Sequence, residues 1–308
     1  MRAAVLLGVF ALVGCHRGGP DLPLISIIIP SQDNPYFKAE GDAASERARQ
    51  LGYRTRVDAH NDDAYRQDNL IDAAIASGAR AIILDNAGSE SSISAVRRAT
   101  QQGVAVFLID REIQVDGIAK AQIIADNEQG ARIVAAEFVR GTGANGEYAE
   151  LLGRESDTNA QVRTKGFHSV LDRNAGLKLV VAQSANWSQS EAFQKVETIL
   201  QAHPRLTGII AGNDTMALGA AAAVKSAGIR NLIITGFDGS PDAIAAIRSA
   251  DLRATSLQPA VFIAKTALDE ADNFLKHGST GKPERQIIPC DLVSAKNIDN
   301  FRDFEKIQ

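Results

Sequence analysis

Short apolar runs, each followed by a helix-forming stretch, constrain the fold of this chain more than any other feature. The clearest pair lies between positions 206 and 242. There an apolar run is followed by Asn213, which is placed to cap an Ala-rich helix that ends near Gly228. A second run, 231–236, is followed by a turn and then by Ser240 and a proline, residues with which helices begin. Polar residues thus follow neighbouring strands at their carboxyl ends, where open α/β sheets bind ligands.

The same alternation runs along most of the chain. The predicted strands cover 24–29, 54–58, 81–85, 104–109, 122–125, 148–152, 178–182, 207–211, 231–236, 252–257 and 285–289. The predicted helices cover 36–51, 63–77, 90–102, 128–140, 159–173, 189–202 and 260–276, besides the two that follow 207–211 and 231–236. Alternation at a spacing of about 25 residues is typical of a parallel, doubly wound sheet, and the series occurs twice. We therefore predict an α/β fold with two doubly wound parallel-sheet lobes and a polar end after 285–289.

The N-terminus predicts export and lipidation. A positively charged start precedes an apolar run that is too short to span a bilayer and suits a signal peptide. The run ends in Leu-Val-Gly-Cys15, the pattern of a bacterial lipobox, in which the cysteine is lipidated and becomes the new N-terminus. We predict a signal peptide over 1–14, a lipidated tether over 15–23 and a membrane-anchored lipoprotein in the periplasm or at the cell surface. The alternative is an ordinary cleavable signal with a chance cysteine.

Composition and motifs exclude several classes of protein. A net charge of −4 and a pI of about 5.8, with no basic stripe, argue against nucleic acid as a partner. With Cys15 lipidated, Cys290 has no disulfide partner and is predicted to be a small buried side chain. The G-x-G-x-x-G string at 141–146 lies between a predicted helix and a predicted strand, the reverse of the dinucleotide-binding order. The histidines are far apart and no hydrolase or phosphate-binding motif occurs, so we predict no cofactor, no metal and no enzyme.

The residues at the predicted strand ends are of two chemical kinds. The polar members are Asn34, Asp110, Arg111, Arg163, Asn213, Asp238 and Gln258, and the aromatic members are Tyr36, Phe37 and Trp187. Amides, carboxylates and guanidinium groups match sugar hydroxyls in pairs, while aromatic rings pack on the C–H faces of a sugar. Taken singly, these residues have purely structural alternatives: Asn34, Asn213 and Asp238 as helix caps or turn formers, Trp187 and Phe37 as core residues, and Arg163 as a solvated helix residue. The whole set predicts a sugar site.

Several motifs made of these residues resemble a known family. They are Asn34-Pro35-Tyr36-Phe37, Leu108-Ile109-Asp110-Arg111, Ala125-Asp126-Asn127, Arg163 four residues before Phe167, the run from Asn213 to Ala220, Gly236-Phe237-Asp238-Gly239, and Gln258 after Leu257. With these motifs, essentially the whole mature chain resembles the periplasmic ribose-binding protein family, the type I solute-binding proteins of ABC importers. The family shares its fold with the effector domains of the lactose-repressor family.

The resemblance implies a site and its residues. Ribose contacts would fall on the seven polar residues above, and ring packing would come from the three aromatic ones. The family commonly has Phe where this chain has Tyr36 and Trp187, which leaves the sugar class intact but not the identity of the sugar. The run from Glu155 to Asp157 is more acidic than expected, and it would either touch a different hydroxyl or cap the helix at Asn159.

The resemblance also implies a domain organisation and a function. An N-terminal lobe would comprise 24–125 plus 259–288 and a C-terminal lobe 126–258 plus 289–308, with three crossings, near 126, 258 and 289, forming a hinge. The protein would be a lipid-anchored monomer that closes over ribose or a similar pentose or polyol and delivers it to an inner-membrane ABC permease.

Rival interpretations remain open at this stage. A sensor that presents a sugar or furanose signal to a membrane receptor, and a ligand that is another sugar or an inositol, are both compatible with the sequence. A sugar-handling enzyme would reveal itself by turnover. A repressor would need a basic DNA-binding segment where the predicted lipobox lies.

Overall fold

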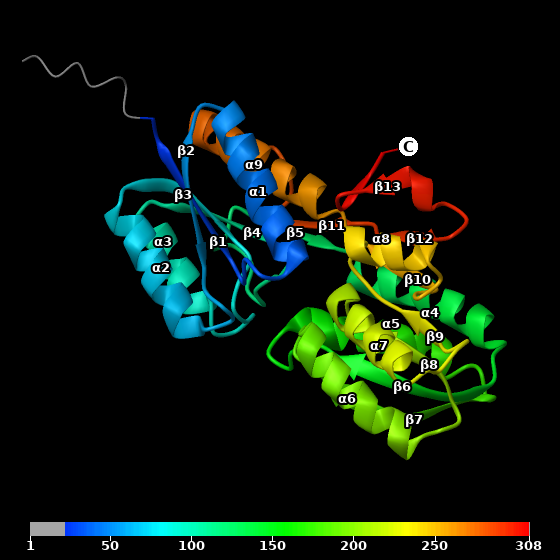
Figure 1. The fold of residues 1–308 in the computed structure, drawn as a ribbon. Coiled ribbons are helices and arrows are strands. Elements are labelled where there is room, and N and C mark those ends of the chain that lie inside the picture. The colour runs from blue at the N-terminus through cyan, green and yellow to red at the C-terminus, as the bar shows by residue number, and fades with distance from the viewer. Residues whose placement is uncertain (1–21, 308) are drawn as a thin grey trace, which may run out of the picture.

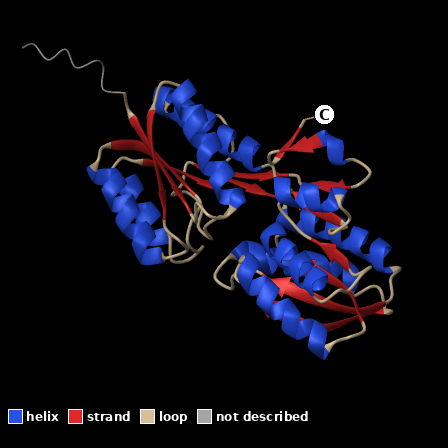
Figure 2. Ribbon diagram, viewed as in Figure 1, coloured by secondary structure: helices blue, strands red, loops and turns tan. Residues whose placement is uncertain are grey.

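The computed structural model describes residues 22–307, which fold into two lobes of sheet and helix joined by three connections (Figure 1). The predicted signal peptide, Cys15 and the tether up to residue 21 lie outside the described residues. Each lobe has a six-stranded sheet at its centre with helices on both faces (Figure 2). Within 22–307, no helix has the length and apolar character that a membrane crossing requires.

The first lobe is built on a fully parallel sheet with the strand order β11-β5-β4-β3-β1-β2. Its strands are β1 (Leu24–Ile29), β2 (Arg54–Ala59), β3 (Ala79–Leu84), β4 (Ala105–Ile109), β5 (Ala121–Ala125) and β11 (Arg285–Ile288). Its helices are α1 (Pro35–Gln50), α2 (Ala64–Ala76), α3 (Ile93–Gln101) and α9 (Ala260–His277). Alternate side chains of β1 pack against opposite faces: Ile27 lies in the cluster with α1 and α9, and Ile28 in the cluster with α2 and α3. This central strand is buried throughout, as its apolar run predicts.

The second lobe is built on a sheet with the strand order β12-β10-β9-β8-β6-β7. Its strands are β6 (Gly146–Leu152), β7 (Leu177–Ser184), β8 (Leu206–Ala211), β9 (Ile233–Thr235), β10 (Ala254–Leu257) and β12 (Asp291–Ser294). Its helices are α4 (Asn127–Thr142), α5 (Thr158–Leu171), α6 (Gln189–Ala202), α7 (Asp214–Ser226) and α8 (Pro241–Arg248). The predicted fold class, α/β with two parallel-sheet lobes, is confirmed, apart from β12, which runs antiparallel to β10.

The C-terminal end holds more structure than the sequence predicts. Strand β12 pairs with β10, a 3₁₀-helix covers Ile298–Asn300, and β13 (Phe301–Arg302) forms a hairpin with β14 (Glu305–Lys306). These segments are too short to show a hydrophobic period, and the partner of β12 is distant in sequence. The strand predicted over 231–236 is shorter in the structure and covers only Ile233–Thr235.

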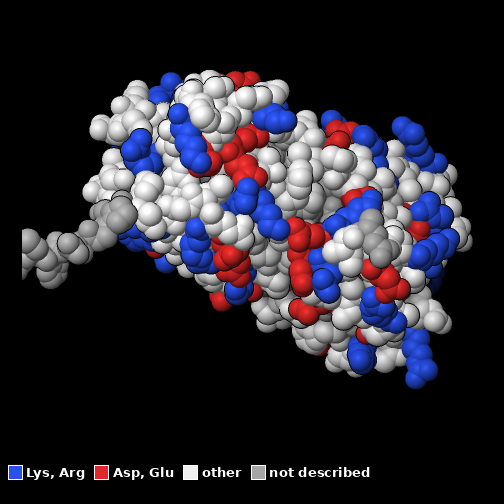
Figure 3. Space-filling model, turned by 90° about the horizontal axis from the view of Figure 1, so that it is seen from above, with Lys and Arg blue, Asp and Glu red and all other residues white. Residues whose placement is uncertain are grey.

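The chain passes between the two sheets at three places: after β5, after β10 and after β11. Helix α4 follows β5 and packs on the second sheet, helix α9 follows β10 and packs on the first, and β12 follows β11 in the second. On the face drawn in Figure 3, basic and acidic side chains are interspersed, so this face presents no field of a single sign.

Candidate functional site

A small cavity lies where the two lobes meet, and residues from both lobes line it. The lining residues are Asn34, Tyr36, Phe37, Asp110, Asp157, Asn159, Arg163, Trp187, Asn213, Asp238 and Gln258. The structure thus brings together nine of the ten predicted site residues, all except Arg111, and adds Asp157 and Asn159. The cavity volume is about 20 Å³, close to the space that one water molecule needs.

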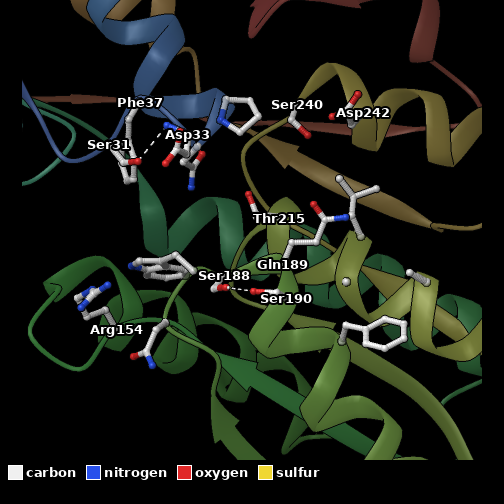
Figure 4. Close-up of a pocket in the computed structure, with 18 of the residues that line it drawn as sticks. Ser31, Asp33, Phe37, Arg154, Ser188, Gln189, Ser190, Thr215, Ser240 and Asp242 are labelled. Atoms are coloured by element: carbon white, nitrogen blue, oxygen red, sulfur yellow. Dashed lines mark hydrogen bonds between the residues drawn. The ribbon is translucent and has the colours of Figure 1, made fainter. Parts of the chain in front are cut away.

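A larger groove of about 1040 Å³ opens from this cavity between the lobes. It shares Asn34, Phe37 and Trp187 with the cavity. Figure 4 shows Ser31 and Phe37 facing Ser188, Gln189 and other residues of the second lobe across this groove. The groove provides the route by which a solute would reach the cavity.

The first-lobe wall of the cavity comes from the start of α1. Asn34 caps this helix, because its Oδ1 accepts a hydrogen bond from the backbone N–H of Tyr36 at 3.0 Å. The Tyr36 hydroxyl then donates to Asp110 Oδ1 at 3.3 Å, and the Phe37 ring lies edge-on to the Tyr36 ring. Burial, and after it the charge of Asp110, raise the pKa of Tyr36 well above its usual value. Tyr36 therefore stays a neutral hydroxyl that both donates and accepts.

Arg163 of α5 is the main cation of the second-lobe wall. Its Nε donates to Asn127 Oδ1 at 2.7 Å, and one Nη donates to the carbonyl of Gly212 at 2.9 Å and lies 3.4 Å from Asp238 Oδ1. The guanidinium group also lies over the ring of Phe237, 4.0 Å from its centre, and faces the ring of Trp187 at 5.4 Å. These contacts hold a buried planar donor at the edge of the cavity.

Asp238 and Gln258 complete this wall at the ends of two neighbouring strands. Gln258 Nε2 donates to Asp238 Oδ1 at 2.8 Å, and Asp238 has a backbone φ of 122°, which is unusual for a residue other than glycine. Burial raises the pKa of Asp238 well above its usual range, and the charge of Arg163 opposes that shift.

Asn213 lines the cavity as well and also caps α7, accepting from the N–H of Met216 at 2.9 Å. Asn34 and Asn213 thus cap helices and line the cavity at the same time, so the two interpretations do not exclude each other.

Sequence reasoning left Asp157 undecided and did not place Asn159 in the site. Asp157 caps α5, since its Oδ1 accepts from the N–H of Asn159 at 2.9 Å. Asn159 Nδ2 reaches across to the other lobe, 3.3 Å from both the carbonyl and Oδ1 of Asp110. Asn213 was identified as a polar residue between a strand and the helix that follows it. Asp157 and Asn159 offer the same signal, because they lie where the loop after β6 leads into α5.

Arg111 does not line the cavity, unlike its predicted companions. Its guanidinium group is buried among carboxylates: one Nη lies 2.8 Å from Asp62 Oδ1, and Nε lies 2.9 Å from Asp157 Oδ2 and 3.5 Å from Asp85 Oδ1. It also lies over the ring of Phe37 at 5.0 Å. Arg111 therefore braces the wall of the cavity from behind in this structure.

Two further carboxyl groups are buried behind this wall. Glu40 of α1 and Asp85 after β3 are both fully buried, and among residues 22–307 neither carboxyl group has a hydrogen-bond donor other than the other carboxyl group of this pair. Burial, and next the charge of Asp85, raise the pKa of Glu40 well above its usual value. Burial likewise raises the pKa of Asp85, against the opposing charge of Arg111. Glu40 therefore keeps its proton to a higher pH than an ordinary glutamate.

Burial of Glu40 predicts a pH dependence of the stability that Glu40→Gln reduces. A carboxyl with a raised folded-state pKa stabilises the fold below its unfolded pKa, about 4.3, and this contribution is lost as the pH rises through the folded pKa. The uncharged amide of Gln does not titrate, so the variant should unfold at a higher temperature than the parent at pH 8, and the gap should shrink towards pH 5. Thermal unfolding across this range measures it.

The control is Glu46→Gln, a matched substitution on the exposed face of the same helix. The pKa of Glu46 is lowered, first by its hydrogen bond with Arg49, so this substitution should give no gain at pH 8. A Glu40→Gln variant whose melting temperature follows that of the parent at every pH would contradict the account of this buried pair.

Two other features noted in the sequence, Cys290 and the glycine string at 141–146, do not line the cavity. Cys290 is buried, and burial raises the pKa of its thiol to about 12, as expected for an unreactive side chain. The glycine string at 141–146 joins α4 to β6, with Gly143 ending the helix in the left-handed conformation. Within 22–307, no cluster of His, Cys, Asp or Glu has the arrangement of a metal site.

Comparison with known proteins shows what the whole chain is similar to. Residues 25–280 match the family model described as a periplasmic binding protein domain. The chain is 54% identical over 302 residues to the D-apiose import binding protein of Paraburkholderia graminis, in an alignment that covers 98% of this chain and 96% of that protein. It is 32% identical over 255 residues to the ribose import binding protein of Bacillus subtilis, covering 82% of each.

A solved structure shows the same architecture. The chain superposes with a TM-score of 0.85 on an ABC transporter periplasmic solute binding protein from Actinobacillus succinogenes with bound D-allose. The two are 26% identical, and the superposition covers 91% of this chain and 100% of that one.

Proposed function

The chain belongs to the periplasmic binding protein family, and from this premise we propose that it captures D-apiose between its two lobes and delivers it to an ABC importer. The observation that carries the proposal is the 54% identity, over nearly the whole of both chains, to a D-apiose import binding protein. Identity to a ribose import binding protein is much lower, at 32%. The family binds its solute rather than converting it, so the prediction of a binding protein and not an enzyme is confirmed.

The chemistry of the cavity supports a small polyhydroxylated ligand. Asp110 and Asp238 supply acceptors, Arg163 supplies donors, and the Tyr36 hydroxyl supplies both. The ring of Trp187 supplies an aromatic face for the C–H groups of a sugar. The sugar-contacting residues that we propose are Asn34, Tyr36, Phe37, Asp110, Asn159, Arg163, Trp187, Asn213, Asp238 and Gln258.

The size of the cavity supports capture by lobe movement. A monosaccharide does not fit into about 20 Å³, and polar contacts such as Asn159 to Asp110 close the cavity between the lobes. The lobes, 24–125 plus 259–288 and 126–258 plus 289–308, would open about the three connections, admit the sugar from the groove and shut on it. Because the sugar touches both lobes only in the shut form, binding shifts the equilibrium towards that form, which the permease would recognise.

We further propose that the protein works in the periplasm or at the cell surface and is held to the membrane through Cys15. The family supports a location outside the cytoplasm, and the proposed anchor rests on the lipobox in the sequence. Mass spectrometry of the mature chain tests it. An unmodified N-terminus downstream of Cys15 would contradict the anchor without affecting the proposed ligand.

A thermal-shift panel tests the ligand. D-apiose, D-ribose, D-allose, L-arabinose and myo-inositol are added at equal concentrations to the mature protein. A ligand at a hundred times its Kd stabilises the folded state by about 2.7 kcal/mol. We expect D-apiose to raise the melting temperature most; a larger shift with another member of the panel would replace D-apiose with that sugar.

A further inference from the structure

A short loop between β6 and α5, residues 153–157, connects the aromatic wall of the cavity to the opposite lobe. At its end, Asp157 Oδ2 accepts a hydrogen bond from Nε1 of Trp187 at 3.1 Å. The same oxygen lies 2.9 Å from Nε of Arg111, which belongs to the first lobe. All three side chains are nearly fully buried. One carboxylate oxygen therefore joins the indole of one lobe to the guanidinium group of the other.

A second contact from this loop spans the lobes in the same direction. Arg154 Nε lies 3.3 Å from Oδ2 of Asp62, the residue whose other oxygen pairs with Arg111. The loop thus reaches the first lobe through two ion pairs, one with Arg111 itself and one with Asp62, which also pairs with Arg111. Since Arg111 and Asp62 move with the first lobe, both pairs exist only when the lobes are together.

The Trp187 indole is confined by its surroundings as well as by its hydrogen bond to Asp157. The backbone of Trp187 is left-handed, with φ of 64°, and Gly153 lies directly beneath the ring, where a Cβ would come within 2.0 Å of it. The other oxygen of Asp157 is used by the helix cap at Asn159. The position of the ring is therefore set by the Gly153 surface on one side and by the Asp157 oxygen at its N–H.

We propose that Asp157 is a positioning residue, which fixes the Trp187 indole against the sugar when the lobes close. The proposal rests on the proposed capture of a sugar between the lobes. In the open form Asp157 loses Arg111, and the indole is held by one hydrogen bond to an unpaired carboxylate. On closure the cation orders that carboxylate, and the ring becomes rigid at the moment when the sugar is enclosed.

Asp157→Asn separates this role from helix capping. Asparagine caps helices as well as aspartate does, so Oδ1 keeps the bond from Asn159. Its amide N–H₂ then faces the N–H of Trp187 and the cation of Arg111, where only an acceptor fits. We expect the Kd for D-apiose to rise about tenfold, mostly through faster dissociation, as for most changes at a binding site. Asp63→Asn, the same change at the cap of α2, should leave the Kd within about twofold of the parent.

The fluorescence of the single tryptophan gives a readout that a general loss of structure would not mimic. In protein saturated with D-apiose, acrylamide should quench Trp187 at least about twofold more strongly in Asp157→Asn than in the parent or in Asp63→Asn, because the ring is no longer held. An unchanged Kd together with unchanged quenching in Asp157→Asn would overturn the proposal.

A double-mutant cycle with Trp187→Phe tests the contact even if Asp157→Asn folds poorly. Phenylalanine lacks the N–H and leaves the cap untouched, so calorimetry should show weaker binding for Trp187→Phe and little further loss on adding Asp157→Asn. Fully additive losses would mean that Asp157 acts independently of the indole and would reject its positioning role. If the parent does not bind D-apiose, the proposed ligand fails, and the same comparison is made with the sugar of the panel that stabilises the parent most.

Discussion

Replacing Arg163 with methionine is expected to weaken D-apiose binding at least about a hundredfold. The variant loses the donors that face Asn127, Gly212 and Asp238, and it leaves Asp238 buried without its cation. Hydrogen bonds that involve a charged group contribute about 1.5–3 kcal/mol each, and a hundredfold change in Kd corresponds to about 2.7 kcal/mol. Losing two such hydrogen bonds to the enclosed sugar is enough to reach that factor. Calorimetry on the folded variant measures it.

Two comparisons make this result specific. Arg132→Met removes an exposed arginine of α4 that pairs with Glu128, and it should leave the affinity within about twofold. Arg163→Lys keeps the charge but not the planar fork, so its affinity should lie between those of the parent and Arg163→Met. If Arg163→Met binds D-apiose as tightly as the parent, Arg163 is only a structural brace and the second-lobe wall is wrongly assigned.

Gly153→Ala is the second change with a large expected effect, although it adds only one methyl group. The new Cβ would lie 2.0 Å from Cη2 and Cζ2 of Trp187, so the indole has to leave its position at the cavity. Overpacking of this kind costs about 1–3 kcal/mol of stability. We expect at least about a tenfold loss of affinity, because a displaced ring either blocks the cavity or no longer contacts the sugar. Thermal unfolding and calorimetry measure the two effects.

A compensating variant distinguishes displacement of the ring from general damage. Phenylalanine lacks the outer ring of the indole, so Gly153→Ala combined with Trp187→Phe should recover most of the stability that Gly153→Ala loses. Gly41→Ala, whose added Cβ would meet nothing closer than 3.1 Å, is the control for a glycine change elsewhere. A double variant that is less stable than Gly153→Ala alone would contradict the clash.

The candidate site residues that were predictable from the sequence are those whose position follows from a local sequence pattern. Asn34 and Asn213 were identifiable because a helix cap directly after an apolar strand is a local pattern, and parallel strands bring such positions to one edge. The same pattern explains why the order of strands and helices was predictable through α9. The continuous apolar run of β1 likewise indicated a strand that is buried on both faces.

What the sequence did not reveal depends on contacts between distant segments. Arg111 follows β4 next to Asp110, and nothing local indicates that Asp62, Asp85 and Asp157, from three separate loops, surround its guanidinium group. Strand β12 exists because β10 offers it a partner, not because of its own composition. The identity of the sugar is likewise outside the reach of local patterns, since the residue types that line the cavity suit many pentoses and polyols.

Titration calorimetry of the mature parent protein with D-apiose and with D-ribose tests the central claim most directly. The account predicts one D-apiose bound per chain, with a Kd at least about tenfold lower than that for D-ribose, which corresponds to about 1.4 kcal/mol of discrimination. Binding of D-ribose that equals or exceeds that of D-apiose, or no D-apiose binding where another sugar of the panel saturates the site, would contradict it.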